Sequence, residues 1–503
     1  MLPALAACAL LAAQTDPASD KPSRWWLDAV FYEVFVRSFA DSTEGPLASD
    51  GVGDLRGLAA RLDLLNDNDP TTTHDLGVTA LWLMPVAQSP SYHGYDVVDY
   101  GRVDDEYGTR EDFLALIDAA HARGMRVIVD MVINHTSSAH PWFVESIDPG
   151  SARHAWYRWE ASPARDERWS SPVWHDRWRA RNGKHAFGLF WEHMPDLNLD
   201  SPEAARAITN ASIAWLTDFR ADGLRIDAAK HLIERGAAVE NTPETIAWLE
   251  RYRGAIRDAA PDAFVVGEVW SPSAEIAPYL RGGLDSAFCF DLAEGILASV
   301  RGREGASLRA ALARALQADP EGRMAVFLSN HDQTRAMTRL DHDPLGARLA
   351  AEIMLTLPGV PFLYYGEELG VAGDKPDPDL RLPMPWTEGP EPDGGIEPFS
   401  RARAWREGDS RARPWASQTG DETSLLSAYR LAIRRRLESP ALRRGSCQLL
   451  RPADPALVAF LREHPEERVL VVINLGDEAV EGDASWAVRG PFEPRSVNVL
   501  PLP

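Results

Sequence analysis

Three acidic residues each follow a short apolar run, and this pattern points most directly to chemistry. They are Asp227 in GLRIDAAKH, Glu268 in AFVVGEVW and Asp332 in AVFLSNHDQ. Runs of Val, Ile, Leu and Phe bounded by polar residues predict buried strands. Packing alone seldom places an acid there, because an unpaired carboxylate is costly to desolvate. Together the three acids predict a catalytic mouth at the carboxyl ends of parallel strands.

The neighbours of the first two acids suggest different roles. Arg225 precedes Asp227 by two residues, so strand alternation points both side chains to one face. A guanidinium keeps a carboxylate ionised, which suits a nucleophile. Glu268 instead lies among five apolar residues: Phe264, Val265, Val266, Val269 and Trp270. Apolar surroundings favour the protonated form, which suits a general acid, and the pair of roles predicts glycoside cleavage.

Each acid also has a plainer explanation when it is taken singly. Asp227 could cap a helix, Glu268 could serve a salt bridge, and Asp332 could belong to a turn after Asn330. Three such endings in order along one chain, with Arg225 beside the first, favour the catalytic interpretation.

Five segments occur in the order typical of one enzyme family. They are DMVINH (130–135), MPDLN (194–198), GLRIDAAKH (223–231), GEVW (267–270) and FLSNHD (327–332). On these segments the chain resembles the α-amylase family, glycoside hydrolase family 13, from about residue 25 to 390. The resemblance implies Asp227 as nucleophile, Glu268 as general acid/base and Asp332 as transition-state stabiliser. It also implies that four residues line the subsite of the sugar under attack: Tyr95, His135, Arg225 and His331.

The acids need a scaffold, and the chain contains eight strand-like runs. These are Ala29–Phe39, Thr79–Val86, Arg126–Ile133, Gly223–Ala228, Phe264–Val269, Ser286–Leu292, Met324–Ser329 and Gly359–Tyr365. Helical patterns lie between most of them, one from the N-cap Thr109 to Gly124 and another starting at Ser201-Pro202-Glu203. This alternation predicts an α/β fold, the (β/α)8 or TIM barrel. The acids end the fourth, fifth and seventh runs, and His135 follows the third.

Two stretches break the alternation. Residues 135–200, between the third and fourth strands, hold seven of the 17 tryptophans: Trp142, Trp156, Trp159, Trp169, Trp174, Trp178 and Trp191. The family places its domain B here, in which a minority of these rings would bind sugar and the rest would pack. From about residue 406 strand-like alternation returns and predicts a C-terminal antiparallel β domain. We therefore divide the chain into a leader and tether (1–22), barrel (23–134 and 201–405), domain B (135–200) and C-terminal domain (406–503).

The amino-acid composition limits the kinds of ligand that the protein is expected to bind. The net charge of −23, from 75 acids against 52 bases, repels nucleic acid and favours a neutral ligand such as an α-glucan or maltooligosaccharide. No later span of 18 or more apolar residues predicts a transmembrane helix. The three cysteines give no disulfide framework, and Cys289 is predicted to be a buried thiol. We expect a monomer.

The N-terminus predicts export. Residues 1–13 are almost wholly Leu and Ala, and a polar, Pro-containing stretch follows, as in a secretory leader and tether. Leu5-Ala6-Ala7-Cys8 resembles the lipobox of bacterial lipoproteins. The protein would then be extracellular or periplasmic, either anchored by a lipid on Cys8 or exported with a chance cysteine in the leader.

Two places resemble calcium sites of the family. In the loop DSTEGPLASDGVGD, Asp41, Asp50, Asp54 and the Val52 carbonyl match the expected ligands, although one ligand is missing and Asp41 is displaced. Calcium takes six to eight oxygen ligands, so this site should be weak. A second site would use Asn134, Asp196 and the backbone carbonyl of His231. Alternatively, Asn134 and Asp196 only hydrogen-bond the hinge of domain B.

The sequence indicates the substrate specificity less clearly than it indicates the family. Lys230 and His231 resemble the leaving-group subsites of endo-acting α-amylases, whereas RLPMPW (381–386) resembles oligosaccharide-active members. Our first hypothesis is an α-amylase that cleaves α-1,4-glucosidic bonds of starch and maltooligosaccharides with retention, by double displacement. The alternatives are an exo-acting α-glucosidase or oligo-1,6-glucosidase, and a 4-α-glucanotransferase. A non-catalytic binding homologue is the remote alternative, because such relatives have lost the acids kept here.

Overall fold

The fold is that of a computed structural model, which describes residues 24–163, 173–387, 412–482, 486 and 490–503. The predicted leader with Cys8, and Trp169 of domain B, lie outside these ranges, so export and lipidation stay predictions. Among the helices of the described ranges, none is both apolar enough and long enough to span a bilayer.

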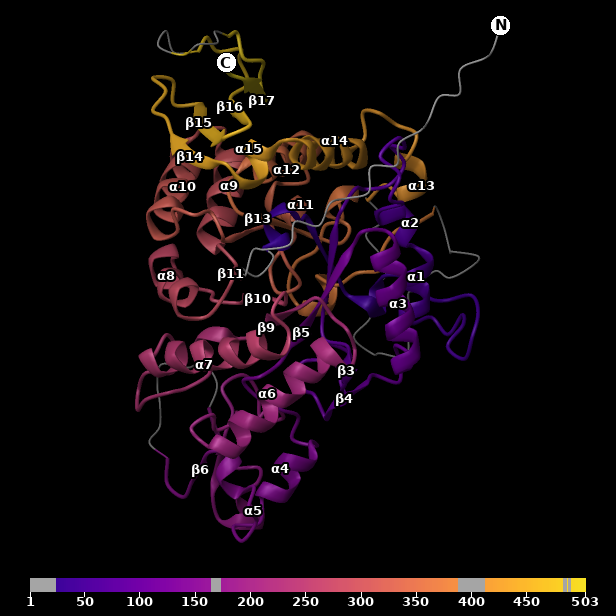
Figure 1. Ribbon diagram of the computed structural model, residues 1–503, viewed down its shortest axis with the longest axis vertical. Helices are drawn as coiled ribbons and strands as arrows, with labels where there is room; N and C mark the ends of the chain where they lie inside the picture. Colours follow the sequence, from indigo (N-terminus) through magenta and orange to yellow (C-terminus); the bar gives the residue numbers. More distant parts are fainter. Residues whose placement is uncertain (1–23, 164–172, 388–411, 483–485, 487–489) are drawn as a thin grey trace, which may run out of the picture.

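Eight parallel strands form a nearly closed barrel, which confirms the predicted fold class. The strands, in chain order, are β1 (Phe31–Val34), β2 (Ala80–Leu83), β5 (Arg126–Met131), β9 (Gly223–Ile226), β10 (Phe264–Gly267), β11 (Ser286–Ala287), β12 (Ala325–Val326) and β13 (Val360–Tyr364). β1 pairs with both β2 and β13, and a single bridge between Phe288 and Ala325 links the two ends of the sheet. The carboxyl ends of all eight strands therefore meet at one mouth (Figure 1).

Helices alternate with these strands and cover the barrel (Figure 1). The helices of the described residues are α1 (Leu55–Ala60), α2 (Leu62–Leu65), α3 (Arg110–Ala122), α4 (Pro141–Ser146), α5 (Arg179–Asn182), α6 (Pro202–Thr217), α7 (Pro243–Ala259), α8 (Ser273–Gly282), α9 (Phe290–Gly302), α10 (Ala306–Ala318), α11 (Ala336–Arg339), α12 (Pro344–Thr356), α13 (Trp415–Gln418), α14 (Leu425–Glu438) and α15 (Pro440–Arg444). The predicted start signals are confirmed. Thr109 and Asp112 form a reciprocal capping box at α3, and Ser201 caps α6 with Pro202 at its first position.

Aromatic rings fill the barrel interior on the side away from the carboxyl ends of the strands. Phe31 stacks on Phe362 with ring centroids 4.3 Å apart, and Trp82 and Phe264 are as fully buried. Trp26 of the 3-10 helix η1 (Trp25–Asp28) stacks on Phe264 from the amino-terminal end. These rings close the barrel below the mouth, so a ligand reaches the strand ends only from the carboxyl side.

All eight strands are shorter than the runs that predicted them, and in two runs only two residues form the strand. The run Ser286–Leu292 was predicted as one strand, but β11 stops at Ala287 and helix α9 begins at Phe290. In the run Met324–Ser329 only Ala325–Val326 pair as a strand. Both errors have one cause: a short apolar run that passes from a strand into a turn or helix keeps no distinguishing period.

Two smaller units flank the barrel at opposite ends of the molecule (Figure 1). The first holds the short hairpin β3 (Ala87–Gln88) with β4 (Asp99–Val103), helices α4 and α5, and a sheet of β6 (Trp159–Glu160), β8 (His185–Phe187) and β7 (Trp174–His175). The second is an antiparallel sheet of β14 (Ser446–Leu449), β15 (Leu457–His464), β16 (Glu467–Asn474) and β17 (Ser496–Pro501). Its strands begin at Ser446 rather than near residue 406, because residues 415–444 fold as helices α13 to α15. The other domain limits stay predictions.

Candidate active site

Asp227 and Glu268 leave neighbouring strands at the same level. Asp227 follows β9 and Glu268 follows β10, and the last residues of these strands, Ile226 and Gly267, are partners in the parallel ladder. The Glu268 N–H donates to the Ile226 carbonyl at 2.9 Å, which fixes the register directly at the two acids. Because parallel strands in register present equivalent positions side by side, both carboxyl groups enter the same mouth.

Arg225 binds both acids. Its Nη1 lies 2.7 Å from Asp227 Oδ1, and its Nη2 lies 2.8 Å from Glu268 Oε2. The guanidinium is fully buried, with its carbon 5.2 Å from the ring centroid of Trp82. The predicted pairing of Arg225 with Asp227 is confirmed. The expectation of a purely apolar setting for Glu268 was wrong, because the β9–β10 register brings Glu268 to the same guanidinium.

The turn after the nucleophile position has an unusual backbone. Ala228 adopts the left-handed region with φ of 47° and ψ of 36°, which costs a residue with a Cβ about 1–2 kcal/mol. The turn directs the Ala228 N–H to Glu268 Oε2 at 3.1 Å. The strain therefore supports a second hydrogen bond that orients the Glu268 carboxyl group.

The two acids share one cation in a buried setting. Burial raises the pKa of Asp227 and the pKa of Glu268 above ordinary carboxyl values, Arg225 opposes the rise, and the negative charge of Asp332 adds to it. Two close carboxyl groups with one guanidinium between them favour a state in which one is ionised and the other keeps a proton. This is the combination that a nucleophile and a general acid need.

Asp332 is ionised by its neighbours. Burial alone would raise its pKa, but His331 at 3.2 Å and Arg381 at 2.9 Å hold it well below its usual range. Burial likewise would lower the pKa of His331, yet the carboxylates of Asp332 and Glu33 outweigh it and raise that pKa to about 10. Both ring nitrogens of His331 face acceptors, Nδ1 toward Glu33 and Nε2 toward Tyr95 and Asp332. His331 is therefore an imidazolium at neutral pH.

A buried polar network positions these groups from below. Asp130 of β5 accepts from Arg225 Nη1 at 2.9 Å and from the Tyr95 hydroxyl at 3.0 Å. Tyr95 in turn lies 2.6 Å from His331 Nε2, and His135 Nε2 bonds the Tyr95 carbonyl at 3.0 Å. Burial lowers the pKa of His135 to about 4, so this ring is neutral. The network therefore fixes the positions of a cationic histidine, His331, and a neutral one, His135, next to the mouth.

The mouth opens into a pocket of about 250 Å³. Its lining residues are His93, Tyr95, His135, Phe190, Met194, Asp227, Ala228, Glu268, Asp332, Asp377 and Arg381. Five predicted site residues thus meet here: Tyr95, His135, Asp227, Glu268 and Asp332. Arg225 and His331 support the pocket from beneath without lining it.

Lys230 and His231 lie beside the pocket rather than in its lining. Lys230 Nζ donates to the Trp270 carbonyl at 2.8 Å and pairs with Glu240 at 2.7 Å. The His231 ring stands edge-on to Phe190 at 5.6 Å and bonds the Val239 carbonyl. This placement suits the predicted outer subsite, and their roles stay predictions.

Six lining residues were not predicted as site residues, although three of them belong to quoted segments: Met194 in MPDLN, Ala228 in GLRIDAAKH and Arg381 in RLPMPW. His93, Phe190 and Met194 lie in loops and Asp377 begins a short 3-10 helix, so no strand ending marks any of them. A detectable signal was the YHGYD segment, which carries His93 two residues before Tyr95. The others approach the mouth only through the tertiary fold.

Most described tryptophans of residues 135–200 are structural. Trp142, Trp156, Trp159 and Trp178 pack against the main core, and Trp174 packs against a smaller apolar cluster. Trp191 differs, with 46% of its surface exposed, as do its neighbour Phe190 at 47% and Trp270 at 45%. The exposed aromatic faces near the mouth are therefore Phe190, Trp191 and Trp270, of which two were not singled out as sugar platforms.

The loop of the first predicted calcium site satisfies its own acids. Asp41 accepts the N–H groups of Ser49 and Gly51, and Asp54 caps α1 while accepting from Ser42. Burial, together with Asp50 and Asp54, raises the pKa of Asp41 to about 6. Backbone donors thus meet part of the hydrogen-bonding capacity of Asp41 and Asp54, and calcium at this loop stays a prediction.

The second predicted calcium site fits a cation better. Asp196 is 1% exposed, and its Oδ2 has no hydrogen-bond partner in the described structure. Burial and nearby Glu234 raise its pKa, whereas the Asn134 amide bonds it and Arg158 offsets part of the charge. A buried carboxylate oxygen without a partner suits a hard cation. Asn134, Asp196 and the His231 carbonyl would hold calcium there. No group of three or more His, Cys, Asp or Glu side chains in the described ranges is arranged for a metal.

Calcium removal tests the second site. If the ion binds at Asp196, EDTA should lower the melting temperature by roughly 3 °C or more, because a ligand of the folded state adds to its stability. Asp196→Asn should abolish this response, whereas Asp50→Asn in the first loop should keep it. Melting curves with and without EDTA, read for all three proteins, check the expectation. If EDTA changed neither the melting curve nor the rate of the wild type, calcium would have no part in its stability or activity.

Paired carboxyl groups at the ends of adjacent barrel strands supply a nucleophile and a proton donor for displacement at a glycosidic carbon. The fold and the site thus define a barrel-type glycoside hydrolase. A model of the alpha amylase catalytic domain matches residues 33–445, and a model of the maltogenic amylase C-terminal domain matches residues 447–501. The chain belongs to the α-amylase family, glycoside hydrolase family 13.

Relatives within the family carry several activities in their names. The chain is 36% identical to "Alpha-amylase 3" of Dictyoglomus thermophilum, over 90% of this chain and 85% of that protein. It is 34% identical to a "Trehalose synthase" of Thermus thermophilus, over 90% of this chain but only half of the relative. The crystal structure of alpha-amylase from H. orenii superposes with a TM-score of 0.81 at 37% identity, covering 90% of this chain and 91% of that one. The family is thus settled, and the bond specificity needs its own argument.

The charge of His331 gives a pH prediction. A pKa of about 10 against an ordinary value of 6.5 means that the cation stabilises the site fully below about pH 6.5, a contribution lost as pH rises toward 10. Glu33→Gln removes one of the two carboxylates that raise this pKa. We expect the alkaline limb of the kcat profile to move down by about one pH unit or more.

The check is a kcat–pH profile of wild type and Glu33→Gln, paired with a spectroscopic titration of the His331 ring. Glu321→Gln, which removes an exposed acid at the other end of the barrel, serves as the charge-matched control. Identical alkaline limbs in wild type and Glu33→Gln would show that Glu33 does not hold the proton on His331.

Proposed function

We propose that the protein is a retaining hydrolase of α-1,4-glucosidic bonds in starch and maltooligosaccharides, an α-amylase in activity. The observation that carries the proposal is the binding of Asp227 and Glu268 to one guanidinium. A guanidinium that holds two carboxyl groups through neighbouring nitrogens keeps them close to each other. Retaining enzymes in general need such closeness, with their two carboxyl groups about 5–5.5 Å apart. The names of the Dictyoglomus relative and the H. orenii structure support the α-1,4 assignment.

In the first step Asp227 attacks the anomeric carbon while Glu268 gives its proton to the departing glycosidic oxygen. The C–O bond to the leaving sugar breaks as the bond to the Asp227 oxygen forms. In the second step Glu268, now a carboxylate, takes a proton from water. The water oxygen bonds the anomeric carbon as the Asp227 carboxylate departs, and the proton taken from water leaves Glu268 protonated for the next cycle. The sugar is released with its original anomeric configuration.

The remaining charges stabilise the oxocarbenium-like transition state. Asp332 is held ionised, so its carboxylate accepts hydrogen bonds from sugar hydroxyls and places negative charge near the developing cation. The buried His331 imidazolium adds positive charge beneath the pocket and is held by Glu33 and Asp332, while neutral His135 uses its ring N–H on the Tyr95 carbonyl, so both rings fix the positions of the groups that line the pocket. Such preorganised groups lower the barrier only if their contacts strengthen as the ring flattens.

Exposed aromatic rings support a polymeric or oligomeric substrate. Phe190 lies 5.5 Å from the His135 ring and 5.6 Å from the His231 ring, on the way from the reacting subsite to the outer one. Trp270 follows Glu268 by two residues and stacks on Phe290 at 4.6 Å, which fixes its half-exposed face. Rigid apolar faces next to the mouth suit the flat faces of successive sugar units.

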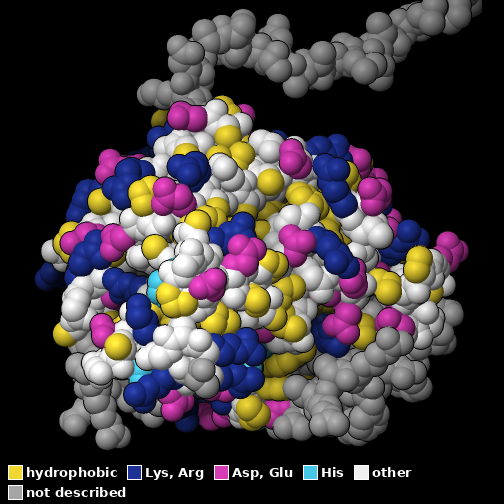
Figure 2. All heavy atoms as spheres, turned by 90° about the horizontal axis from the view of Figure 1, so that it is seen from below, with side chains coloured by type: hydrophobic (Ala, Val, Ile, Leu, Met, Phe, Trp, Pro, Cys, Tyr) yellow, Lys and Arg dark blue, Asp and Glu magenta, His cyan; other side chains and the backbone are white. Residues whose placement is uncertain are grey.

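The surface at the end of the molecule that carries α4 and α5 agrees with a neutral ligand. Figure 2 shows that basic and acidic side chains are interspersed on the face at the lower end of Figure 1, with apolar patches between them. A mixed surface gives no field of one sign to steer a charged polymer.

An exo-acting α-glucosidase is the second candidate, and one feature favours it. The pocket of about 250 Å³ is small, and Arg381 bonds Asp332 at 2.9 Å while approaching Asp377 at 3.6 Å, so that these side chains form one wall of the pocket. A wall at the reacting subsite would favour cleavage from a chain end. "Probable oligo-1,6-glucosidase 2" of Bacillus subtilis is 28% identical over 90% of this chain and 91% of that protein.

Products from defined oligosaccharides separate the candidates. An α-amylase should cut maltoheptaose internally, release α-anomers, and act equally on maltoheptaose blocked at its non-reducing end. An exo-acting enzyme should release glucose alone and leave the blocked substrate intact. A 4-α-glucanotransferase should give longer chains, and activity on α-1,6 or α-1,1 linkages exceeding that on α-1,4 would overturn the proposal.

A further inference from the structure

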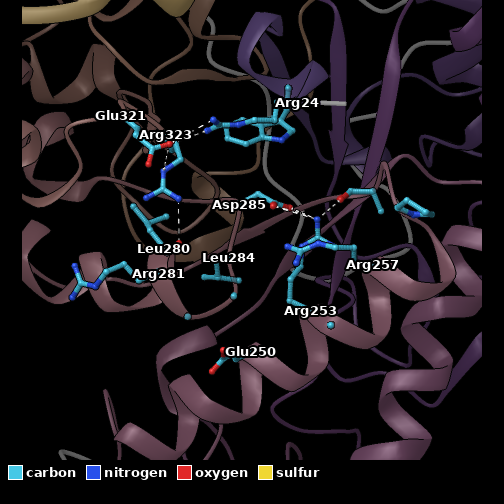
Figure 3. A pocket seen from close by; sticks show the side chains of 16 residues that line it. Arg24, Glu250, Arg253, Arg257, Leu280, Arg281, Leu284, Asp285, Glu321 and Arg323 are labelled. Atoms are coloured by element: carbon cyan, nitrogen blue, oxygen red, sulfur yellow. Dashed lines mark hydrogen bonds and ion pairs between the residues drawn. The ribbon is translucent and has the colours of Figure 1, made fainter. Parts of the chain in front are cut away.

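A second, larger pocket lies at the opposite end of the barrel from the acids. Its volume is about 530 Å³, and it is lined in part by residues that immediately precede strands: Ala263 before β10 and Asp285 before β11. Strand amino ends lie on the face away from the catalytic mouth. Figure 3 shows the side chains gathered around this space between helix α7 and the barrel. The described contacts of the active site involve none of its residues.

Basic side chains dominate the pocket. Five arginines line it, against three acids: Arg24, Arg253, Arg257, Arg281 and Arg323, with Glu250, Asp285 and Glu321. The formal balance is positive, although the whole chain carries −23. A concentration of arginine against the overall charge of the protein marks a place where negative ligands are favoured.

Two of the arginines form no salt bridge. Arg24 pairs with Glu321 at 3.4 Å, and Arg323 pairs with Asp319 at 3.1 Å. In the described ranges, by contrast, no hydrogen bond or ion pair joins the side chain of Arg257 or Arg281 to another residue, and Arg257 acts on Asp285 only through longer-range charge. Their guanidinium groups are therefore available to a ligand at no cost in broken salt bridges.

Arg253 gives the strongest sign of an incomplete site. It is 4% exposed, and only its Nη2 is used, toward the Ala263 carbonyl at 3.0 Å and toward Asp285 at 2.9 Å. Its Nε and Nη1 have no hydrogen-bond partner in the described structure. Figure 3 shows this guanidinium beside Asp285, across the pocket from Arg323. Buried donors without acceptors are costly, so an acceptor that enters the pocket would be stabilising.

Helix α7 builds one wall of the pocket with a single face. Glu250, Arg253, Gly254 and Arg257 follow the spacing that places residues on one side of a helix. A Cβ added at Gly254 would meet no atom within 4 Å. The missing side chain at this position keeps the pocket open between the arginines of the wall.

We propose that this pocket binds a small molecule with at least two phosphate groups. The planar guanidinium fork matches phosphate oxygens and binds them in pairs. The volume exceeds what one phosphate fills, and the arginines occupy separate walls, so several linked oxyanions satisfy them better than one (Figure 3). The acid Glu250 sits at the exposed edge of the α7 wall and leaves the inner arginines free.

Titration calorimetry with sodium tripolyphosphate tests the proposal. Ionic strength is held constant with sodium chloride, and inorganic phosphate is run as the single-group comparison. We expect saturable binding of tripolyphosphate, with weaker binding of inorganic phosphate. The double substitution Arg257→Gln/Arg281→Gln should weaken binding about tenfold or more, because two charge-assisted contacts are lost.

Two further variants separate a built pocket from general charge. Arg206→Gln/Arg251→Gln removes the same charge from exposed arginines of α6 and α7 outside the pocket, and it should bind tripolyphosphate like the wild type. Gly254→Leu fills the space without changing charge and should abolish binding, while rates on maltoheptaose stay unchanged in all variants. Absence of saturable binding in the wild type, or equal loss in both double variants, would overturn the proposal.

Discussion

Asp227→Asn should lower kcat on maltoheptaose by about four orders of magnitude, equivalent to roughly 5.5 kcal/mol of barrier. The amide has no negative charge to form the bond to the anomeric carbon, so the covalent step fails. The side chain nevertheless keeps an oxygen that can accept from Arg225 Nη1, now 2.7 Å from Asp227 Oδ1. Arg225 also keeps its contacts with Asp130 and Glu268. The fold should therefore survive, and the loss should be chemical.

Initial rates, melting curves and binding of maltoheptaose to the variant check this prediction. Asp118→Asn removes an exposed carboxylate of α3 that pairs with Arg220, and it should leave kcat unchanged. Asp227→Ala serves as a second test, because an asparagine that deamidates would restore aspartate and mimic residual activity. A folded Asp227→Ala protein with more than about a hundredth of the wild-type rate would refute the nucleophile assignment.

The three acids could be predicted from the sequence because each follows an apolar run that indicates a buried strand. A Val- or Ile-rich strand that ends in a carboxylate is conspicuous at Asp227 and Glu268, and parallel strands bring their ends together by construction. The same reasoning placed Thr109 and Ser201 at helix starts, since capping depends on neighbours within three residues.

Contacts between distant strands could not be foreseen from local patterns. The sequence suggested an apolar Glu268, but the pairing of Val266 with Arg225 in the β9–β10 ladder brings Glu268 to the guanidinium. Glu33 of β1 reaches His331, which follows β12, two strands away in the sheet, and nothing within β1 indicates that its acid faces a histidine. Register and closure are properties of the whole sheet, so their consequences appear only in three dimensions.

Loops and the C-terminal segment show a second limit. Phe190, Asp377 and Arg381 reach the pocket from irregular segments with no period to mark them. Residues 415–444 were assigned to a β domain, yet they form three helices before the sheet begins at Ser446. α14 packs beside α12 of the barrel, so tertiary packing on the barrel rather than the later strands decides its structure.

Glu268→Gln should separate the two steps of the reaction. Glutamine cannot give a proton to the leaving oxygen, so cleavage of maltoheptaose should fall by about three orders of magnitude. An aryl maltooligoside with an acidic phenol needs little protonation, because its leaving group is already stable as an anion. The first step on that substrate should therefore stay fast, while hydrolysis of the glycosyl-enzyme should slow for want of a base.

A rapid-mixing experiment with the aryl substrate distinguishes this outcome from general damage. Glu268→Gln should release one equivalent of phenol per enzyme in a burst and then turn over slowly. Added azide, an anion that needs no base, should speed the slow phase in Glu268→Gln and leave the wild type unaffected. The amide oxygen of the introduced glutamine would still accept from the Ala228 N–H and Arg225, the two donors that now orient Glu268, so the pocket should keep its shape. Equal losses on the aryl and natural substrates, with neither burst nor azide rescue, would mean that Glu268 acts through the structure of the site rather than by moving a proton.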